Sequence, residues 1–404
     1  MVKNNFKFTI SACFLGYITQ AIMINFPPLL FVFFSTSLGV SESEITILIV
    51  SNFVLELVVD ALASKFADKI GYKPLVICAN VFAISGLVAM ALAPIILPDY
   101  MVFAGLMVAM ALCGIGGGLM EVLISPIIEA CPTKNKSGFM SLLHSFYCWG
   151  QLGVVLISTA FFLLAGIENW YFMAFFWTIV PFLGILLFAF APINRLVEDG
   201  KGASLGTLLK NKTFWIFLIM MLCAGASELT MSQWASYFAE TALGVEKWLG
   251  DLLGPCLFAF AMAITRVFFA KVSEKIKLDT AIFVSSLISV GTYILAIASK
   301  DAPVLSLVGC ACCGFGCGIM WPASFSLVSG KIPNGGVLMF GVLALMGDAG
   351  CLVGPTLAGS ASSAFGGDIR IGFAFAIIFP ALMAIMSFIL MLQRKKDKNV
   401  KSDL

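Results

Sequence analysis

The chain has 404 residues, of which 60% are hydrophobic and only 11% are charged, and its mean hydropathy is +1.03. Soluble domains are typically about 45–50% apolar and about 25% charged, so this composition excludes an ordinary soluble protein and indicates a membrane protein. The formal net charge is only +2 and the basic residues are scattered, which excludes a broad nucleic-acid-binding surface.

Long apolar runs recur along the chain, separated by short polar loops. Each run has about twenty residues or more, enough for a helix to cross about 30 Å of hydrocarbon, and none alternates as barrel strands do. Helices satisfy their own backbone within lipid, so we expect an all-α integral membrane protein with twelve transmembrane helices in two six-helix bundles. The expected spans cover residues 8–34, 44–63, 75–97, 101–130, 139–165, 170–192, 213–239, 250–270, 280–299, 303–329, 336–364 and 370–392.

The polar stretch 193–212 divides the expected spans into two sets of six. We therefore expect an N-terminal bundle over residues 1–192, a cytoplasmic linker over 193–212, and a C-terminal bundle with a short cytoplasmic tail over 213–404. Alternate loops and the two ends hold 20 of the 24 Lys and Arg residues, and the opposite loops hold only Lys247, Lys300 and Arg370. Basic residues collect on the cytoplasmic side, so this pattern predicts a multi-pass protein of the cell membrane with both termini in the cytoplasm.

The second expected span carries Asn52, Glu56 and Asp60 at intervals of four residues. This spacing places the three polar side chains on one helix face. Charged groups are costly in lipid, so this polar stripe is expected to face the protein interior.

The loop after this span, Ser64–Lys73, matches the segment that begins at Ala270 in the second half. It resembles the loop signature of the major facilitator superfamily, Gly-x-Leu-Ala-Asp-Arg-x-Gly-Arg-Lys, with Ser64 in place of the first glycine. The resemblance implies two pseudo-symmetric six-helix bundles and a gating role for Asp68 at the cytoplasmic face. A solvated charged loop is the alternative interpretation of Asp68.

A closer repeat lies in the fourth and tenth expected spans, where Cys113–Glu121 reads nearly the same as Cys313–Trp321. Internal repeats of this kind are typical of secondary transporters. One position changes character between the copies, because Glu121 in the first stands where Trp321 stands in the second. This difference marks both residues as candidates for function.

The segments Gly116–Pro126 and Leu142–Phe146 resemble the fucose–proton symporter branch of the superfamily. The resemblance implies a proton-coupled sugar carrier in which Glu121 binds the proton. The helix-1 aspartate of that branch has no counterpart in this chain, where Gln20 and Asn25 are the nearest polar residues. We expect these two amides to contact the solute.

Glu121 and His144 are the expected proton-coupling residues. They lie at similar distances from the loop that joins the fourth and fifth spans, so we expect them at similar depth in the membrane. A carboxyl group removed from water holds its proton more tightly, and histidine titrates near neutral pH. His144, the only histidine, tunes Glu121 or bonds the solute in this interpretation; the alternative is a bond to a backbone carbonyl.

The second half offers acids, amides and aromatic rings for a polar solute. Sugars stack their C–H faces on such rings and need hydrogen-bonding groups for their hydroxyls. For Trp234 and Tyr237, a place in the aromatic belt at the membrane surface is the alternative. The predicted solute-binding residues of this half are Glu228, Gln233, Trp234 and Trp321.

The loop repeat also aligns Asp60 with Arg266, the one basic residue within an expected span. Opposite charges at equivalent positions suggest a cytoplasmic gate in which the two residues pair with each other or with neighbours. A static role for each residue within its own half is the alternative.

Four cysteines cluster in the tenth expected span, yet Cys317 matches Gly117 in the repeat. Small residues allow close helix packing in lipid, so we expect neither a metal nor another cofactor. The chain also shows no catalytic constellation and no phosphate-binding loop, so an enzyme is not expected.

These patterns together predict a secondary active transporter that moves a small polar solute by alternating access. A sugar is the expected solute and protons the expected coupling ion, with sodium as the alternative ion, and we expect a monomer in the bilayer. The competing interpretations are an exporter or exchanger of another small organic solute, such as a peptide or drug, and a non-transporting membrane sensor or scaffold. A scaffold would not need so many costly buried charges.

Overall fold

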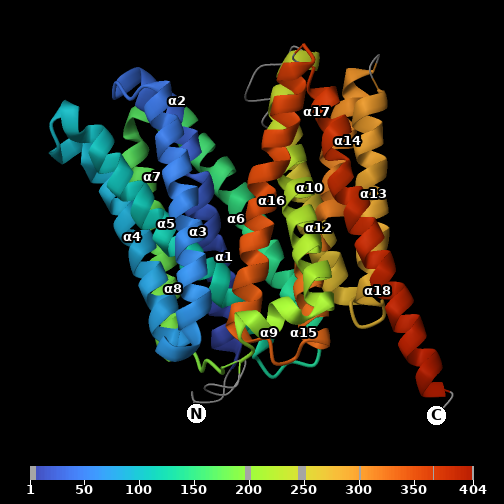
Figure 1. Ribbon diagram of the computed structural model, residues 1–404. Coiled ribbons are helices and arrows are strands. Elements are labelled where there is room, and N and C mark those ends of the chain that lie inside the picture. The colour runs from blue at the N-terminus through green and yellow to red at the C-terminus, as the bar shows by residue number, and fades with distance from the viewer. Residues whose placement is uncertain (1–5, 196–201, 244–251, 300–301, 367, 403–404) are drawn as a thin grey trace. The chain divides into compact units, whose positions relative to one another are not determined.

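The computed structural model describes residues 6–195, 202–243, 252–299, 302–366 and 368–402. Within these ranges every regular element is a helix, as Figure 1 shows. Some predicted features extend beyond the described residues: the ends of the two bundles (1–5 and 403–404), the middle of the linker (196–201), the start of the eighth span (250–251) and the loop lysines Lys247 and Lys300.

The helices fall into two compact units. Unit 1 comprises residues 1–134, 146–203 and 334–342, and unit 2 comprises residues 135–145, 204–333 and 343–404. Two long helices therefore contribute their first turns to one unit and the rest of their length to the other.

Unit 1 contains most of the first six spans, some of them divided into shorter helices. Its elements are α1 (Phe6–Asn25), η1 (Pro27–Leu30), α2 (Phe31–Ser37), α3 (Glu42–Ile70), α4 (Tyr72–Ile96), α5 (Asp99–Glu129), most of α6 (Lys136–Ala165), η2 (Ile167–Asn169), α7 (Trp170–Trp177) and α8 (Ile179–Phe190).

Unit 2 contains most of the last six spans and receives the first turns of α6. Its elements are α9 (Leu205–Lys210), α10 (Lys212–Leu243), η3 (Leu252–Cys256), α12 (Leu257–Val272), α13 (Leu278–Ala298), α14 (Pro303–Cys317), α15 (Met320–Lys331), most of α16 (Gly336–Ala364), α17 (Ile369–Ala376) and α18 (Ile378–Ser402).

Eleven helical stretches in the described part of the chain are long and apolar enough to cross a membrane. They correspond to every expected span except the second, which α3 occupies with 29 residues. The start and end of α3 are both well defined. Ser41 and Glu44 form a capping box at its N-terminus, and Gly71, with a φ of +99°, makes the turn into α4.

The sixth and twelfth spans are each interrupted at an equivalent point of the repeat. α7 ends at Trp177 and α8 begins at Ile179, while α17 ends at Ala376 and α18 begins at Ile378. Pro181 and Pro380 cause these interruptions, because proline lacks an N–H and clashes with the carbonyl group four residues earlier. The duplicated sequence thus produces a duplicated break.

In unit 1, α5 packs against α4, α3 and α1, and Figure 1 shows α3, α4 and α5 side by side. In unit 2, α13 packs against α14 and α18, and α14 also contacts α12 and α10. The two repeat-related helices, α5 and α14, therefore each lie inside their own unit, where they position the candidate functional residues.

Candidate functional site

The predicted proton-binding residue, Glu121, pairs with a neutral amide in unit 1. Gln20 Nε2 on α1 donates a hydrogen bond to Glu121 Oε2 on α5. Gln20 is 3% exposed and Glu121 is 9% exposed. Among the described residues, Gln20 Oε1 has no hydrogen-bond partner, which leaves a buried acceptor beside the carboxylate.

A second contact joins the same two helices. The Tyr17 hydroxyl lies 3.0 Å from Ser125 Oγ, and both residues are buried. Tyr17 is three positions before Gln20 and Ser125 is four positions after Glu121, so each pair shares one helix face. The sequence analysis missed Tyr17 and Ser125, although this spacing around Gln20 and Glu121 could have indicated them.

Asn25, the other amide predicted to contact the solute, is partly buried and serves its own helix. Its Nδ2 donates to the carbonyl oxygen of Ala21 at 2.9 Å. The structure thus distinguishes the two predicted helix-1 residues, since Gln20 reaches across to α5 and Asn25 bonds within α1.

The polar stripe of α3 is buried against glycines of α5. Asn52, Glu56 and Asp60 are 6%, 7% and 0% exposed, in agreement with the expectation that they avoid lipid. A Cβ atom added to Gly117 would lie 2.8 Å from Glu56 Oε1, and one added to Gly118 would lie 2.7 Å from Asp60 Oδ1. The glycine run of α5 is therefore what allows the acids of α3 to enter the interior of unit 1.

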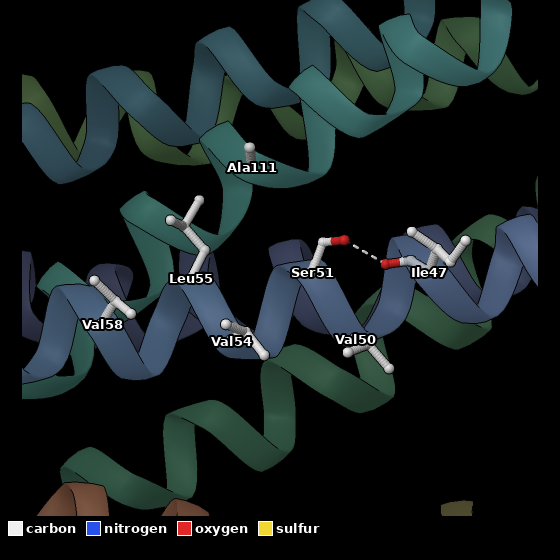
Figure 2. A pocket seen from close by; sticks show the side chains of 7 residues that line it. All are labelled: Ile47, Val50, Ser51, Val54, Leu55, Val58 and Ala111. Carbon is white, nitrogen blue, oxygen red and sulfur yellow. Dashed lines mark hydrogen bonds between the residues drawn. The ribbon is translucent and has the colours of Figure 1, made fainter.

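The opposite face of α3 is apolar and forms a shallow groove with α5, shown in Figure 2. Ser51 is its one polar residue, and its hydroxyl donates to the carbonyl oxygen of Ile47 within the same helix. Such a lining offers a polar solute no available donor and suits acyl chains instead. The remaining lining residues are Val50, Val54, Leu55, Val58 and Ala111.

Asp68, the residue to which the family resemblance assigns a gating role, lies in the last turns of α3 and is partly exposed. It accepts a hydrogen bond of 2.7 Å from the hydroxyl of Tyr72 at the start of α4. This contact ties the carboxylate to the turn at Gly71, and a gating role for Asp68 stays a prediction.

In unit 2, Arg266 on α12 is the centre of a buried polar cluster. The residue is 3% exposed, and its guanidinium contacts groups from three other segments. Nη2 lies 3.2 Å from Glu228 Oε2, Nε donates to the carbonyl oxygen of Gly318 at 2.7 Å, and Nη1 donates to the carbonyl oxygen of His144 at 3.0 Å. Two predicted residues, Arg266 and Glu228, are thus brought together as an ion pair.

His144 belongs to the part of α6 assigned to unit 2, whereas Glu121 belongs to unit 1. The histidine is 4% exposed, and its ring centroid lies 5.9 Å from that of Phe325. Phe325 was not predicted from the sequence. Its position four residues after Trp321 on a helix could have indicated it.

Trp321 lies just after an interruption of the tenth span, where α14 ends at Cys317 and α15 begins at Met320. Its indole is 8% exposed and meets the Phe325 ring edge-on, with centroids 6.1 Å apart. A Cβ added to Gly347 on α16 would lie 2.1 Å from the indole ring, so this glycine is required to seat it. Within the described ranges, Trp321 Nε1 has no hydrogen-bond partner.

The other predicted solute-binding residues of unit 2 lie further along α10. The Trp234 indole N–H donates to the carbonyl oxygen of Pro355 at 3.1 Å, and its ring packs where Gly359 leaves space. Gln233 is exposed, and the side chain of Tyr237 is outside the described set. Trp234 therefore already uses its donor within the protein, in contrast to Trp321.

Several solved structures of transporters share the fold of this chain. The E. coli fucose:proton symporter is similar over 96% of this chain and 99% of its own, with a TM-score of 0.77 and 14% identity. A human organic anion transporter is similar over 95% and 99%, with a TM-score of 0.74 and 15% identity. A bacterial homologue of the iron transporter ferroportin, in an outward-facing state, is similar over 94% and 99%, with a TM-score of 0.72 and 13% identity. Identities this low show the fold alone.

None of the curated proteins compared with the chain matches it significantly. The family model of the Major Facilitator Superfamily matches residues 9–337, which is most of the chain. The expected fold class is confirmed: the protein is an all-α integral membrane protein with twelve transmembrane helices in two pseudo-symmetric bundles. It is a multi-pass transporter of small-molecule solutes rather than an enzyme. The chain belongs to the Major Facilitator Superfamily.

Proposed function

We propose that the chain is a proton-coupled carrier of a small polar solute, with a sugar as the expected class. It acts as a monomer in the cell membrane with both termini in the cytoplasm. The buried carboxylate of Glu121 is the observation that carries this proposal.

Glu121 suits proton coupling because of where it lies and what it contacts. It lies in the C-terminal third of α5 and is 9% exposed, and the amide of Gln20 donates a hydrogen bond to it. Because Gln20 is neutral, this bond orients the carboxylate without neutralising its charge. A charged acid within a membrane span is energetically costly, so it is expected to serve a function. In a proton carrier, that function is to bind and release the coupled proton.

Each unit by itself contains groups that suit a polar solute. In unit 1, Gln20 Oε1 is a buried acceptor, and in unit 2, Trp321 offers an aromatic face and an indole N–H. Sugars combine apolar C–H faces with many hydroxyl groups, so they match this combination better than a purely apolar drug does.

The test uses purified protein in liposomes. We expect addition of the correct sugar to drive proton movement, and an imposed proton gradient to drive accumulation of the sugar. Glu121→Gln should abolish gradient-driven accumulation and keep solute exchange at equal concentrations on both sides. The matched control is Asp99→Asn, which removes an exposed carboxylate from the first turn of the same helix and should behave as the unmodified protein does.

Other outcomes identify the competing functions. Proton movement with an organic anion, peptide or drug and with no sugar would contradict the sugar assignment. Accumulation that follows a sodium gradient alone, or that survives Glu121→Gln in full, would contradict proton coupling through this residue.

A further inference from the structure

Arg266 and Asp60 occupy equivalent positions of the repeat and carry opposite charges. We propose that Arg266 is a positioning residue: it caps the backbone carbonyl that Pro322 leaves without a helical donor, and so holds the helix break that orients Trp321. This proposal replaces a gating role for Arg266. It rests on the proposed function only in assigning the solute to Trp321.

The break between α14 and α15 follows from Pro322. A helical carbonyl normally accepts a hydrogen bond from the N–H four residues later, and proline has no N–H. The carbonyl that loses its donor is therefore that of Gly318, at the interruption between Cys317 and Met320. The helical bonding pattern resumes on both sides of the break, since Gly318 N–H donates to Gly314 and Ala323 N–H donates to Ile319.

Arg266 supplies the missing donor. Its Nε lies 2.7 Å from the Gly318 carbonyl oxygen, and the side chain is 3% exposed, so water cannot easily replace it. A buried carbonyl without a donor destabilises the folded protein, because its hydrogen bond to water is lost and not replaced. The Thr265 side chain of α12 also lies close to this point, because a Cβ on Gly318 would lie 2.8 Å from Thr265 Cβ.

The first half of the chain is an internal control for the effect of Pro322. Gly118 is the equivalent of Gly318, and the residue four positions later is Val122, which has an N–H. α5 accordingly runs without interruption from Asp99 to Glu129. The side chain beside Gly118 is Asp60, a carboxylate that cannot donate to a carbonyl. The acid Asp60 thus faces the helix without a proline at this point, and the base Arg266 faces the helix that is broken by Pro322.

Only arginine can make all three contacts seen at this site. Its planar guanidinium presents donors in a fixed fork, whereas a lysine ammonium is a single point charge. The contacts with Glu228 on α10 and with the His144 carbonyl on α6 fix the orientation of the guanidinium, so that Nε faces Gly318. Glu228 therefore serves as a counter-ion that orients Arg266.

The break determines where the indole of Trp321 lies. Trp321 is three residues after Gly318, and its ring is held between the Gly347 surface of α16 and the edge of Phe325. Any change in the path of the chain at Gly318 moves the start of α15 and rotates the indole away from this seat. Arg266 thus acts on solute affinity through Trp321, without contact with the solute.

A double-mutant cycle between Arg266→Lys and Pro322→Ala tests this proposal. Arg266→Lys keeps the positive charge beside Glu228 and loses the fork that reaches Gly318. We expect it to lower the unfolding temperature of the purified full-length protein and to raise the apparent KM for the solute about threefold or more. In the Pro322→Ala background, the alanine N–H can donate to the Gly318 carbonyl within the helix. Arg266→Lys should then lower the unfolding temperature by less than half the amount that it does when Pro322 is present.

Two matched controls accompany the cycle. Pro126→Ala replaces an in-helix proline of α5 and should leave the cost of Arg266→Lys unchanged. Glu228→Gln removes the ion pair and keeps the hydrogen bond to Gly318. It should therefore lower the unfolding temperature by a similar amount with Pro322 and in the Pro322→Ala background. If Arg266→Lys yields no folded protein, the measurement becomes recovery of monodisperse protein when Pro322→Ala is added.

The proposal is overturned if Arg266→Lys lowers the unfolding temperature equally with and without Pro322. It is also overturned if Arg266→Lys does not fold and adding Pro322→Ala does not recover folded protein. The unfolding measurement needs no solute, so it remains decisive even if sugar transport is not observed. If the two substitutions are coupled in unfolding temperature but no sugar is transported, the positioning role of Arg266 is supported and the proposed solute is wrong.

Discussion

At the scale of single residues, the most informative contact is the one between Gln20 and Glu121. Glu121 could be singled out from the sequence because an acid interrupts a repeat, but nothing in the pattern shows which side chain bonds to it. The partner depends on how α1 packs on α5, and the structure identifies Gln20 rather than Asn25. Which side chain of α1 reaches Glu121 depends on how α1 is rotated about its own axis. The apolar pattern of α1 does not specify this rotation.

We expect Gln20→Ala to reduce solute uptake by about tenfold or more, since hydrogen bonds to charged groups are worth about 1.5–3 kcal/mol. The reason is that Glu121 loses the donor that orients it and the solute loses the acceptor beside it. Initial rates of uptake into liposomes measure this. Thr19→Val is the control, because the Thr19 hydroxyl donates to the carbonyl oxygen of Leu15 in its own helix at 3.0 Å. Equal loss in both variants would show that disturbance of α1 alone explains the effect.

At the scale of helices, glycines of α5 determine how deeply α3 can bury its acids. Gly117 and Gly118 are adjacent, yet an added methyl group meets different atoms at each. At Gly117 it meets the mobile end of Glu56, and at Gly118 it meets Asp60 Oδ1 and also the Glu56 backbone oxygen at 2.8 Å. A side chain can move aside, whereas a packed helix backbone cannot.

Gly118→Ala should therefore destabilise the protein more than Gly117→Ala, with a cost of about 1–3 kcal/mol for the former. Thermal unfolding in detergent measures both. Gly153→Ala in α6 is the matched control, because an added Cβ there has no atom within 4 Å and should cost little. A larger cost for Gly117→Ala than for Gly118→Ala would contradict the packing of α3 against α5.

The helix breaks show how far the sequence predicts these elements. Long apolar runs predicted the spans well, because the cost of exposing polar backbone to lipid overrides local propensity. Prolines could have predicted the breaks near Thr178, Ile377 and Gly318. What the sequence does not reveal is the donor that satisfies the free carbonyl at Gly318, since Arg266 is far from it along the chain.

An exchange of charges distinguishes positioning from gating for Arg266. If Asp60 and Arg266 paired directly in a gate, the double variant Asp60→Arg/Arg266→Asp should recover uptake that each single change removes. The contacts in unit 2 predict no recovery, because aspartate cannot donate to Gly318 and arginine would replace the acid packed on Gly118. Uptake assays on the three variants, normalised to the amount of folded protein, measure this. Recovery to near the unmodified rate would restore the gating interpretation.

At the scale of the whole molecule, the duplicated sequence explains both what the halves share and where they differ. The shared features are the glycine-rich fourth and tenth spans and the proline breaks of the sixth and twelfth, and these could be predicted from the repeat. The differences concentrate at a few equivalent positions: Glu121 and Trp321, Val122 and Pro322, Asp60 and Arg266. In the first half they produce a continuous helix beside acids, and in the second a broken helix beside an arginine. Charge and proline content thus changed together while the fold was retained.

This asymmetry predicts that the first half binds the proton and the second half binds the solute. Substitutions in the two halves should therefore have different effects on transport. Trp321→Leu removes the aromatic face and should raise the apparent KM for a sugar about tenfold, while the ratio of protons to solute stays the same. Trp321→Phe keeps an aromatic ring and should recover much of the affinity, because aromatic contacts are worth about 0.5–1.5 kcal/mol beyond their buried area. Glu121→Gln should do the reverse, removing proton movement while solute exchange continues. Simultaneous measurement of sugar uptake and internal pH in liposomes distinguishes these outcomes. Loss of the fixed proton ratio in Trp321→Leu, or of exchange in Glu121→Gln, would show that both residues serve one shared step and that the halves do not divide the work.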